Sequence, residues 1–525
     1  MKLKRPASPA TTANLPLSLG LRRYLYLTAA VTGAAIMIVE ILGAKMLAPY
    51  LGTSHFVWTA QITVTLLALA CGYYAGGRWV DRAPRLGRLY GAVVAAAVYL
   101  CFSVWLVEPV AYQCLEFDLA VGSLLASMFL FFVPLGLLAM VGPFFIRMLT
   151  GSVDTVGGNV GRLTAISTAG SVVGTLLIGY VLIPFLPNSM TMYLTALALM
   201  GVSVGYFATH AKKLSKMAPV LLIVLVGAAT GYAGVHGDNI HNPDIHELFR
   251  GNSNFGLLQV VEWENTERRC YLNDYLAQNT YDPKTRQSTS MYNYMLSGLA
   301  RAYTPKLNDA LCIGMGIGIV PGELARDGVR VDVVEINPAV LPVAVKFFDL
   351  DPKRLNIHFG DGRYFVSRCK KQYDTIILDA FLGDSSPSHL LTREAFTAMR
   401  RLLRPDGTLV INSFGASRGE DPFFIGSLSK TLHAVFKSVR LHQANNGNTF
   451  LVASDQPELE LRRKPDLEAV HPFVRESVAQ AYAGATEAIF ERGIVLTDDY
   501  NPVEFYDARN REHLRRQLAL QMKGE

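Results

Sequence analysis

Seven long apolar runs occupy the first 236 residues of the chain, and they constrain its fold more than any other feature. The runs cover residues 24–47, 56–80, 89–107, 119–146, 163–186, 189–209 and 218–236. A bilayer core of about 30 Å is crossed by a helix of about 20 apolar residues, which is the approximate length of each run. The pattern predicts a multi-pass α-helical membrane domain over residues 1–236, with the lipid bilayer as its partner.

The charge of the chain is divided in the same way as its hydrophobicity. Residues 1–236 carry 15 Lys and Arg against 6 Asp and Glu, whereas the remaining residues carry 34 against 37. The net charge of +6 therefore comes from the membrane half and does not indicate nucleic-acid binding. The six cysteines are scattered without a C-x-x-C pair, so neither a zinc site nor a disulfide framework is predicted, and no metal is expected.

Two charged residues, Glu40 and Lys45, lie inside the first apolar run. A charge at the centre of a membrane helix costs at least about 2.5–3.5 kcal/mol, so it generally faces a partner or a cavity. Lys45 is close to the end of its run, where its side chain can reach the interface. Glu40 is deeper, and two interpretations stay open: it binds a cation such as an amine, or it hydrogen-bonds a neighbouring helix.

The basic residues predict an orientation for the membrane domain. Those that flank the runs all fall on one side, namely Arg22, Arg23, Arg82, Arg85, Arg88, Arg147, Arg162, Lys212, Lys213 and Lys216. With seven spans, this rule makes the N-terminus cytoplasmic and leaves the second half of the chain outside. The stretch 119–150 carries Pro134 and Pro143, and a re-entrant course there would reverse that result.

The second half of the chain changes pattern at about residue 253. Residues 237–252 are interpreted as a linker. Residues 257–263 and 268–274 are short apolar runs separated by a polar turn, which predicts a hairpin that residues 275–280 continue. We therefore expect a small β domain over residues 253–305.

Strands and helices alternate in the remaining residues, 306–525. Strands are expected at 310–315, 329–336, 355–361, 374–380 and 408–414, and helices at 319–328, 339–348 and 393–407. This alternation predicts a doubly wound, largely parallel sheet. Ligands of such sheets bind at the carboxyl ends of the strands, where the strand order reverses.

Glycines and acidic residues fall at the carboxyl ends of four successive strands. They are Gly314, Gly316 and Gly318 in the first loop, then Glu335, Asp361 and Asp379. The G-x-G-x-G loop lets the backbone approach a ligand, but its next position is Ile319, so the G-x-G-x-x-G pattern of pyrophosphate binding is not matched. Glu335 suits hydrogen bonds to ribose hydroxyls, and Asp361 with Gly362 suits an adenine amino group. Together they predict a site for an adenosine without phosphates, such as a sulfonium nucleoside.

Several longer motifs accompany these residues. They are YLNDYLAQ (271–278), VVEIN (333–337), GDGRYF (360–365), YDTIILDAFLGDSSPSHLLTREAF (373–396) and LTDDYNPVE (496–504). From about residue 254 to 502 the chain resembles the spermidine synthase (polyamine aminopropyltransferase) family, in the form fused to a seven-helix membrane domain. The segments 48–59 and 170–187 are similar to the membrane half of that form. The resemblance implies an α/β class I methyltransferase-like (Rossmann-like) domain behind a small N-terminal β domain.

The resemblance also implies a reaction. The enzyme would transfer the aminopropyl group of decarboxylated S-adenosylmethionine to a diamine such as putrescine, giving spermidine and methylthioadenosine. Glu335 and the Asp361–Gly362 pair correspond to nucleoside contacts, and Asp379 corresponds to the catalytic proton acceptor. A carboxylate there can hold a protonated amine and take its proton as the nitrogen attacks carbon. The candidate acceptor-binding residues are Asp384, Tyr292, Asp498 and Asp499.

Three positions depart from the family pattern. Gly256 stands where soluble members have a donor-binding glutamine, Asn293 where they have a polyamine-contacting histidine, and Ile317 where an aspartate holds the aminopropyl ammonium. The loss of that aspartate favours a second hypothesis, a methyltransferase that uses S-adenosylmethionine itself. A third hypothesis, favoured by Glu40 and the seven runs, is a polyamine carrier or sensor regulated by the nucleoside-binding half.

The expected location follows from the donor. Sulfonium nucleosides are made in the cytoplasm, so the catalytic domain is expected there, in a multi-pass protein of the cell (inner) membrane. The basic residues favour the opposite side, and this conflict stays open. A homodimer is also left open.

Overall fold

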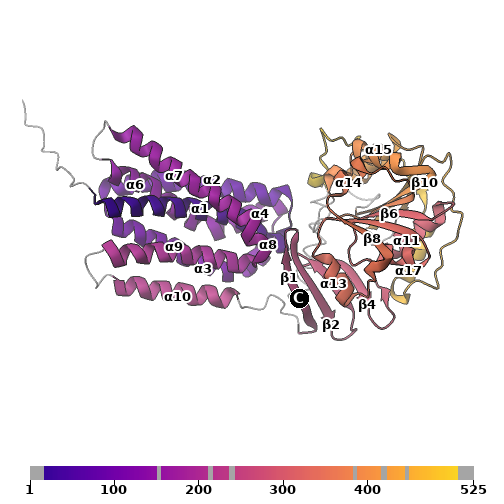
Figure 1. The fold of residues 1–525 in the computed structure, drawn as a ribbon, viewed down its shortest axis with the longest axis horizontal. Helices are drawn as coiled ribbons and strands as arrows, with labels where there is room; N and C mark the ends of the chain where they lie inside the picture. The colour runs from indigo at the N-terminus through magenta and orange to yellow at the C-terminus, as the bar shows by residue number, and fades with distance from the viewer. Residues whose placement is uncertain are drawn as a thin grey trace, which may run out of the picture. The chain divides into compact units, whose positions relative to one another are not determined.

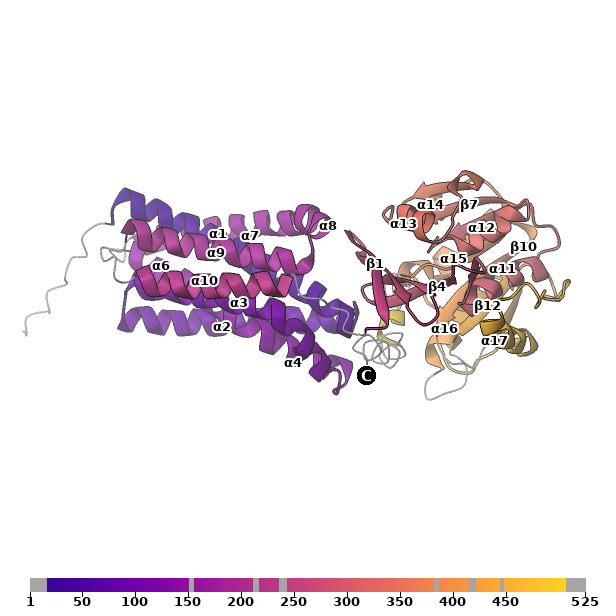
Figure 2. The ribbon, with the colours of Figure 1, turned by 90° about the horizontal axis from the view of Figure 1, so that it is seen from below.

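The computed structural model describes residues 17–150, 155–210, 217–235, 243–381, 387–414, 422–443 and 448–506. The chain divides into two compact units. One consists of Met1–Leu47 with Trp58–Gly237, and the other consists of Ala48–Val57 with Asp238–Glu525. We call them the membrane unit and the soluble unit and treat each by itself (Figures 1 and 2).

Among its described residues, the membrane unit contains seven helical runs that are long and apolar enough to cross a bilayer. Six of them are α1 (Leu19–Leu51), α2 (His55–Arg82), α3 (Leu86–Cys114), α7 (Val156–Leu177) continued by η3 (Ile178–Leu182) and α8 (Ile183–Phe185), α9 (Asn188–His210) and α10 (Met217–Val235). The predicted seven-helix architecture is confirmed. Figure 1 shows α3, α9 and α10 side by side, in agreement with their mutual contacts.

The remaining span, the fourth along the chain, is one helical run from Leu119 to Leu149. It consists of α4 (Leu119–Ser127), the π-helical turn η1 (Met128–Phe132), α5 (Val133–Ala139) and α6 (Val141–Leu149). Pro134 falls at the start of α5, where a missing N–H costs little, and Pro143 lies near the start of α6. The prolines therefore do not turn the chain back, and the re-entrant alternative for residues 119–150 is wrong.

Small residues let α1 and α7 pack closely. A Cβ atom built at Gly170 would lie 2.1 Å from the carbonyl oxygen of Ala30, and one built at Gly174 would lie 2.6 Å from that of Ala34. A larger side chain at either glycine would push the two helices apart. Glu40 lies farther along α1 and is partly buried.

The soluble unit begins with a five-stranded antiparallel sheet in the order β1-β2-β3-β4-β5. Its strands are β1 (Ile245–Ser253), β2 (Gly256–Trp263), β3 (Arg269–Asn273), β4 (Leu276–Asp282) and β5 (Gln287–Ser288). The predicted hairpin is confirmed as β2 and β3, and β4 continues it. The predicted linker 237–252 is wrong from Ile245 onward, because β1 pairs with β2 along its length. Most side chains of β1 are not buried, so its sequence does not show the alternation of apolar and polar residues that indicates a strand.

The larger part of the soluble unit is an eight-stranded sheet in the order β13-β11-β12-β10-β9-β6-β7-β8. Its strands are β6 (Asp309–Ile313), β7 (Arg330–Glu335), β8 (Leu355–Phe359), β9 (Tyr373–Leu378), β10 (Leu403–Phe414), β11 (Ser438–Gln443), β12 (Asn448–Ser454) and β13 (Thr486–Glu487). The neighbours from β10 to β8 are parallel, and β11, β12 and β13 add antiparallel pairings. The predicted doubly wound, largely parallel sheet is confirmed.

Helices cover both faces of this sheet. One apolar core lies under α11 (Met291–Tyr303), α12 (Ile319–Arg326), α13 (Val340–Phe347) and α17 (Pro472–Ala483). The other lies under α14 (Gly362–Arg368), α15 (Arg393–Leu402) and α16 (Phe423–His433). Helix α11 lies within residues 253–305, yet it packs into the core of the α/β domain, so that range is not purely β. The predicted helix 393–407 ends at Leu402, because Leu403 already pairs with β9.

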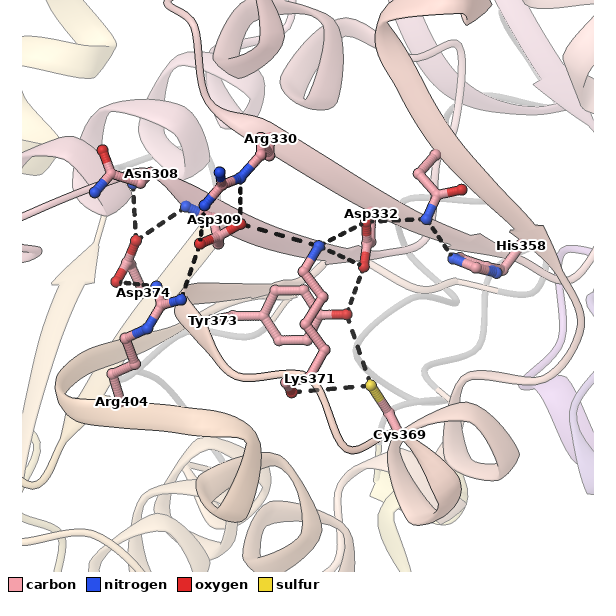
Figure 3. Close-up of polar contacts among 11 residues, drawn as sticks. Asn308, Asp309, Arg330, Asp332, His358, Cys369, Lys371, Tyr373, Asp374 and Arg404 are labelled. Atoms are coloured by element: carbon pink, nitrogen blue, oxygen red, sulfur yellow. Dashed lines mark hydrogen bonds and ion pairs between the residues drawn. The ribbon is translucent and has the colours of Figure 1, made fainter.

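Ion pairs between buried aspartates and exposed arginines tie together the ends of the strands that lie opposite the glycine loop (Figure 3). Both carboxylate oxygens of Asp309, a residue only 2% exposed, accept hydrogen bonds of 2.8 Å from Arg330. Arg404 donates to Asp309 at 2.9 Å and to Asp374 at 2.6 Å, which links β10 to β6 and β9. These guanidinium groups lower the pKa of Asp309 to about 2, against the opposing effect of burial. The network fixes one end of the sheet.

Candidate active site

The strand order reverses between β6 and β9. From β6 the chain goes to β7 and β8 on one side, and β9 and β10 then lie on the other side. The segment after β6 carries the glycine loop, and the residue after β9 is Asp379. The two segments are hydrogen-bonded neighbours, because Asp379 N–H donates to Ile313 O at 2.9 Å. This reversal is the place where doubly wound sheets bind their ligands.

Gly314 lets these two segments approach each other. Its φ is +95°, and a Cβ atom built there would lie 2.1 Å from the carbonyl oxygen of Asp379. Any other residue would meet both backbone strain and a clash. Gly314 is therefore required for the crossing of the two loops, whatever ligand the site takes.

One cavity at this position collects most of the predicted site residues. Its lining includes Gly314, Gly316, Glu335, Asp361, Gly362, Asp379 and Tyr292. The residues come from the carboxyl ends of β6, β7, β8 and β9 and from α11. The proposed roles of the individual side chains stay predictions. Those roles require the side chains to line one cavity, and these residues do.

Glu335, at the end of β7, is a buried carboxylate held by backbone amides. Its Oε2 accepts from Met315 N–H at 2.9 Å and its Oε1 from Asn337 N–H at 2.8 Å. Burial raises the pKa of Glu335, and the amide hydrogen bonds act in the opposite direction. Each carboxylate oxygen can accept a further hydrogen bond, so the group can take two ribose hydroxyls while its orientation stays fixed.

Asp361 lies between β8 and α14, and each of its carboxylate oxygens contacts a group of the protein itself. Its Oδ1 caps α14 by accepting from Tyr364 N–H at 2.8 Å, and its Oδ2 is 3.0 Å from His389 Nε2. His389 also lines the cavity and was not expected from the sequence. The neighbouring Gly362 leaves room for Ile313, since a Cβ atom built there would lie 2.6 Å from the Ile313 Cγ2.

Asp379 has the environment of a general base. Burial raises the pKa of its carboxyl to about 6, while a 2.8 Å hydrogen bond from Asn412 Nδ2 to its Oδ1 works in the other direction. Tyr292 lines the same cavity and donates a hydrogen bond to the carbonyl of Gln278. Burial, followed by the charge of Asp379, raises the pKa of Tyr292 well above its usual value, so its hydroxyl stays neutral. Asn412, on β10, is a second lining residue that sequence reasoning missed.

The other predicted residues that the structure describes, Gly318, Asp498 and Asp499, do not line this cavity. Gly318 begins α12 in the left-handed conformation and faces a different cavity. Asp384 lies outside the described residues. Asp498 accepts from Arg363 at 2.7 Å and from Thr392 at 2.6 Å, and Asp499 is exposed. Neither Asp498 nor Asp499 is therefore brought to the cavity.

The three departures from the family pattern have structural consequences. Ile317 is 1% exposed and belongs to the apolar core, so it does not line the cavity. Gly256 has a φ of +119°, and a Cβ atom built there would lie 2.3 Å from Asn273 Oδ1. Asn293 is buried, and its Nδ2 donates to Asn279 Oδ1 at 3.0 Å and to Ser288 Oγ at 2.8 Å. Asn293 thus supports Asn279, which does line the cavity.

The comparisons with known proteins agree on this part of the chain. Residues 289–445 match the spermine/spermidine synthase domain. A polyamine aminopropyltransferase of Vibrio vulnificus (strain CMCP6) is 31% identical over 234 residues, which are 42% of this chain and 77% of the relative. The chain belongs to the polyamine aminopropyltransferase family. This aminopropyltransferase-family protein is therefore a transferase, as the motifs implied.

Two further similarities are less extensive. An N-terminal histidine N-methyltransferase of Emericella nidulans is 36% identical over 140 residues, but these are only 24% of that relative. The crystal structure of spermidine synthase from Thermotoga maritima has 21% sequence identity and a TM-score of 0.35, over 44% of this chain and 87% of that one.

Proposed function

We propose that this family member is a membrane-bound enzyme that transfers the aminopropyl group of decarboxylated S-adenosylmethionine to a diamine such as putrescine. The products are spermidine and methylthioadenosine. The observation that carries the proposal is the shared cavity of Glu335 and Asp379: one carboxylate is fixed for a ribose, and the other is poised to exchange a proton.

The donor is held through its nucleoside. The Glu335 carboxylate accepts from the two ribose hydroxyls, and the Asp361–Gly362 segment contacts the adenine. The glycine loop brings backbone rather than side chains to the nucleoside, which leaves space for the sulfonium. None of the contacts predicted for this site would hold a phosphate group. This agrees with a donor that is a nucleoside without phosphates.

Asp379 acts on the acceptor. Its carboxylate pairs with the acceptor ammonium and removes one proton, and the freed nitrogen lone pair attacks the methylene carbon next to the sulfonium. The new C–N bond forms as the C–S bond breaks, and the sulfur keeps the electron pair as neutral methylthioadenosine. A pKa of about 6 makes Asp379 mostly ionised at neutral pH and still able to hold the proton it takes. Tyr292, which lines the same cavity, is available to position the amine, and Asp384 stays a candidate for its distal ammonium.

Mass spectrometry of the reaction products tests the proposal. The full-length protein in detergent is given decarboxylated S-adenosylmethionine or S-adenosylmethionine, each with a panel of diamines. We expect a mass gain of one aminopropyl group on a diamine, together with methylthioadenosine. Methylated amine and S-adenosylhomocysteine, with no aminopropyl product, would reject it.

Methyl transfer from S-adenosylmethionine is the second candidate, and Ile317 favours it. A buried isoleucine cannot neutralise the ammonium of an aminopropyl chain, so the preference for the decarboxylated donor must come from other residues. The same product measurement separates the two candidates, because the transferred groups differ in mass.

A further inference from the structure

The soluble unit has a second cavity on the other side of the glycine loop. Gly314 and Gly316 line the first cavity, whereas Gly318 and Ile319 line the second. The second cavity has a volume of about 750 Å³, within the range of about 300–1,000 Å³ that small-molecule sites occupy. It lies between α11, α12 and the segment that precedes α17, and none of the reaction steps above uses it.

The floor of this cavity has an unused polar group. Tyr482, on α17, is 7% exposed, and its hydroxyl has no hydrogen-bond partner among the described residues. The hydroxyl rests on α11, since a Cβ atom built at Gly298 would lie 2.3 Å from it. A buried hydroxyl without a partner is costly, so it points to a ligand atom or a water molecule.

A carboxylate, that of Glu323, lines the same cavity as this hydroxyl. Ser297, the residue before Gly298, donates to Glu323 Oε2 at 2.8 Å, and both Ser297 and Glu323 line the cavity. The carboxylate accepts hydrogen bonds, while the Tyr482 hydroxyl can donate and accept. This pair suits the hydroxyl groups of a sugar, which need partners of both kinds.

The rim of the cavity is rich in cations, and three of them are unpaired. Three lining arginines are neutralised by aspartates, in the pairs Arg286–Asp349 at 3.2 Å, Arg301–Asp327 at 2.7 Å and Arg354–Asp351 at 3.2 Å. Arg326, Arg463 and Lys464 form no ion pair with any acidic side chain of the described residues. An anion is therefore expected at the rim, and arginine favours phosphate because its fork of donors matches phosphate oxygens.

The same charges argue against an amine in this cavity. Asp327, Asp349 and Asp351 are already in ion pairs, and Asp466 accepts from the backbone of its own loop. Among the described residues, a polyamine would thus meet three lining cations without an ion pair, Arg326, Arg463 and Lys464, against two lining carboxylates without one, Glu323 and Asp466. We propose that this cavity is a second binding site, which takes a phosphorylated sugar with its phosphate at Arg326, Arg463 and Lys464 and its hydroxyls at Tyr482 and Glu323.

Isothermal titration of the full-length protein in detergent tests this site. The probes are ribose 5-phosphate, ribose, inorganic phosphate and spermidine. We expect ribose 5-phosphate to bind more tightly than ribose or phosphate alone, and its affinity to fall with added salt. Failure of ribose 5-phosphate to bind, or binding of spermidine in its place, would overturn the proposal.

Variants locate the binding. Tyr482→Phe should weaken ribose 5-phosphate about fivefold and leave inorganic phosphate unchanged, because it removes one hydrogen bond at the floor. The double variant Arg463→Gln, Lys464→Gln should weaken both probes by about tenfold or more. These two residues are exposed, so the variant should keep the thermal stability of the wild type.

Two controls complete the experiment. Lys353→Gln removes a nearby cation that does not line the cavity, and Glu335→Gln alters the first cavity. Both should bind ribose 5-phosphate as the wild type does. If Glu335→Gln abolishes binding, or if neither the Tyr482 nor the double variant changes it, the ligand occupies another place and the proposal fails.

Discussion

Asp379 gives the clearest expectation at the level of single residues. Its pKa of about 6 lies above the ordinary value of 3.8 because it is buried, and the base form is lost as the pH falls through that value. We expect kcat/KM to be level above about pH 7 and to fall about tenfold per unit below pH 6. A pH profile between pH 5 and 8, where the amines of donor and acceptor both stay protonated, measures it, and activity that stays level down to pH 5 would contradict the assignment.

Asn412 modulates the same carboxyl. Its Nδ2 donates to Asp379 Oδ1 at 2.8 Å and stabilises the ionised form. Replacing Asn412 by Ala should therefore move the acid limb of the profile upward by about one pH unit. If the acid side of the pH profile does not move in a well-folded variant, Asn412 does not affect the pKa of Asp379.

Gly256 supports a prediction about specificity. Restoring the family's glutamine there should not restore donor binding, because the backbone has a φ of +119° and a Cβ atom would lie 2.3 Å from Asn273 Oδ1. We expect Gly256→Gln and Gly256→Ala both to lower the stability of the soluble unit by about 1–3 kcal/mol. Thermal unfolding and donor titration check this together. Tighter donor binding by Gly256→Gln at unchanged stability would refute it.

The residues of the site divide into those that sequence could indicate and those that it could not. Glu335 and Asp379 each follow an apolar strand directly, so their position at the sheet edge is a local property. Asn412 and His389 come from later segments, and only the packing of β10 and η6 (Ser388–Leu390) brings them to the cavity. Asp498 follows a turn in a long irregular segment, and its ion pair with Arg363 could not be read from the pattern.

Among the secondary-structure elements, the ends of β6, β9 and β10 carry an ion network in which the aspartates are buried and the arginines are exposed (Figure 3). Asp309 has a pKa of about 2, below its ordinary 3.8, so it stabilises the fold above pH 3.8 and loses that effect as the pH falls toward 2. Asp309→Asn should lower the stability of the soluble unit at pH 7 by about 2 kcal/mol. Thermal unfolding at pH 7 and near pH 2 should show the difference shrinking in acid.

A matched control is the Arg286–Asp349 pair, whose side chains are 70% and 47% exposed. Arg286→Gln should change stability much less than Asp309→Asn does, because both side chains of this pair are exposed to water, whereas the Asp309 carboxylate is buried. Equal effects of Asp309→Asn and Arg286→Gln would mean that the network is not what holds these strand ends.

Elements differed in how well their sequence revealed them. The central strands β6, β7 and β9 are fully buried apolar runs, and the hydrophobic pattern alone indicates them. The sequence of strand β1 does not indicate a strand because its side chains are mostly not buried, and it is a strand only through its pairing with β2. Helix α11 was missed since its apolar face is completed by α12 and α17, which lie farther along the chain.

For the whole molecule, the main expectation concerns sidedness. Seven helices of the described residues are long and apolar enough to span a membrane, and an odd number of spans would put the segments before α1 and after α10 on opposite faces. We expect the soluble unit to be cytoplasmic, where its donor is made, and the N-terminus to be outside, against the rule for basic residues. A pair of C-terminal reporter fusions, one active only in the cytoplasm and one only outside, measures it. Activity of the external reporter alone would contradict this topology.

The two-unit organisation was visible in the composition, because the apolar runs stop at residue 236 and the division of the chain falls at about the same place. Residues 48–57 were not separable in this way. They hold the end of α1 and the start of α2, yet they group with the soluble unit, and the apolar pattern does not indicate this.

The most direct test of the proposed mechanism compares product formation with methylthioadenosine binding in the variant Asp379→Asn. The exchange keeps the shape of the side chain but removes the base, so product formation should fall by about 100- to 10,000-fold while methylthioadenosine binds as it does to the wild type. Asp406→Asn, an exposed carboxyl at the opposite end of the sheet, should leave both unchanged. Wild-type turnover by Asp379→Asn would contradict the claim that Glu335 and Asp379 divide donor binding and proton removal between them.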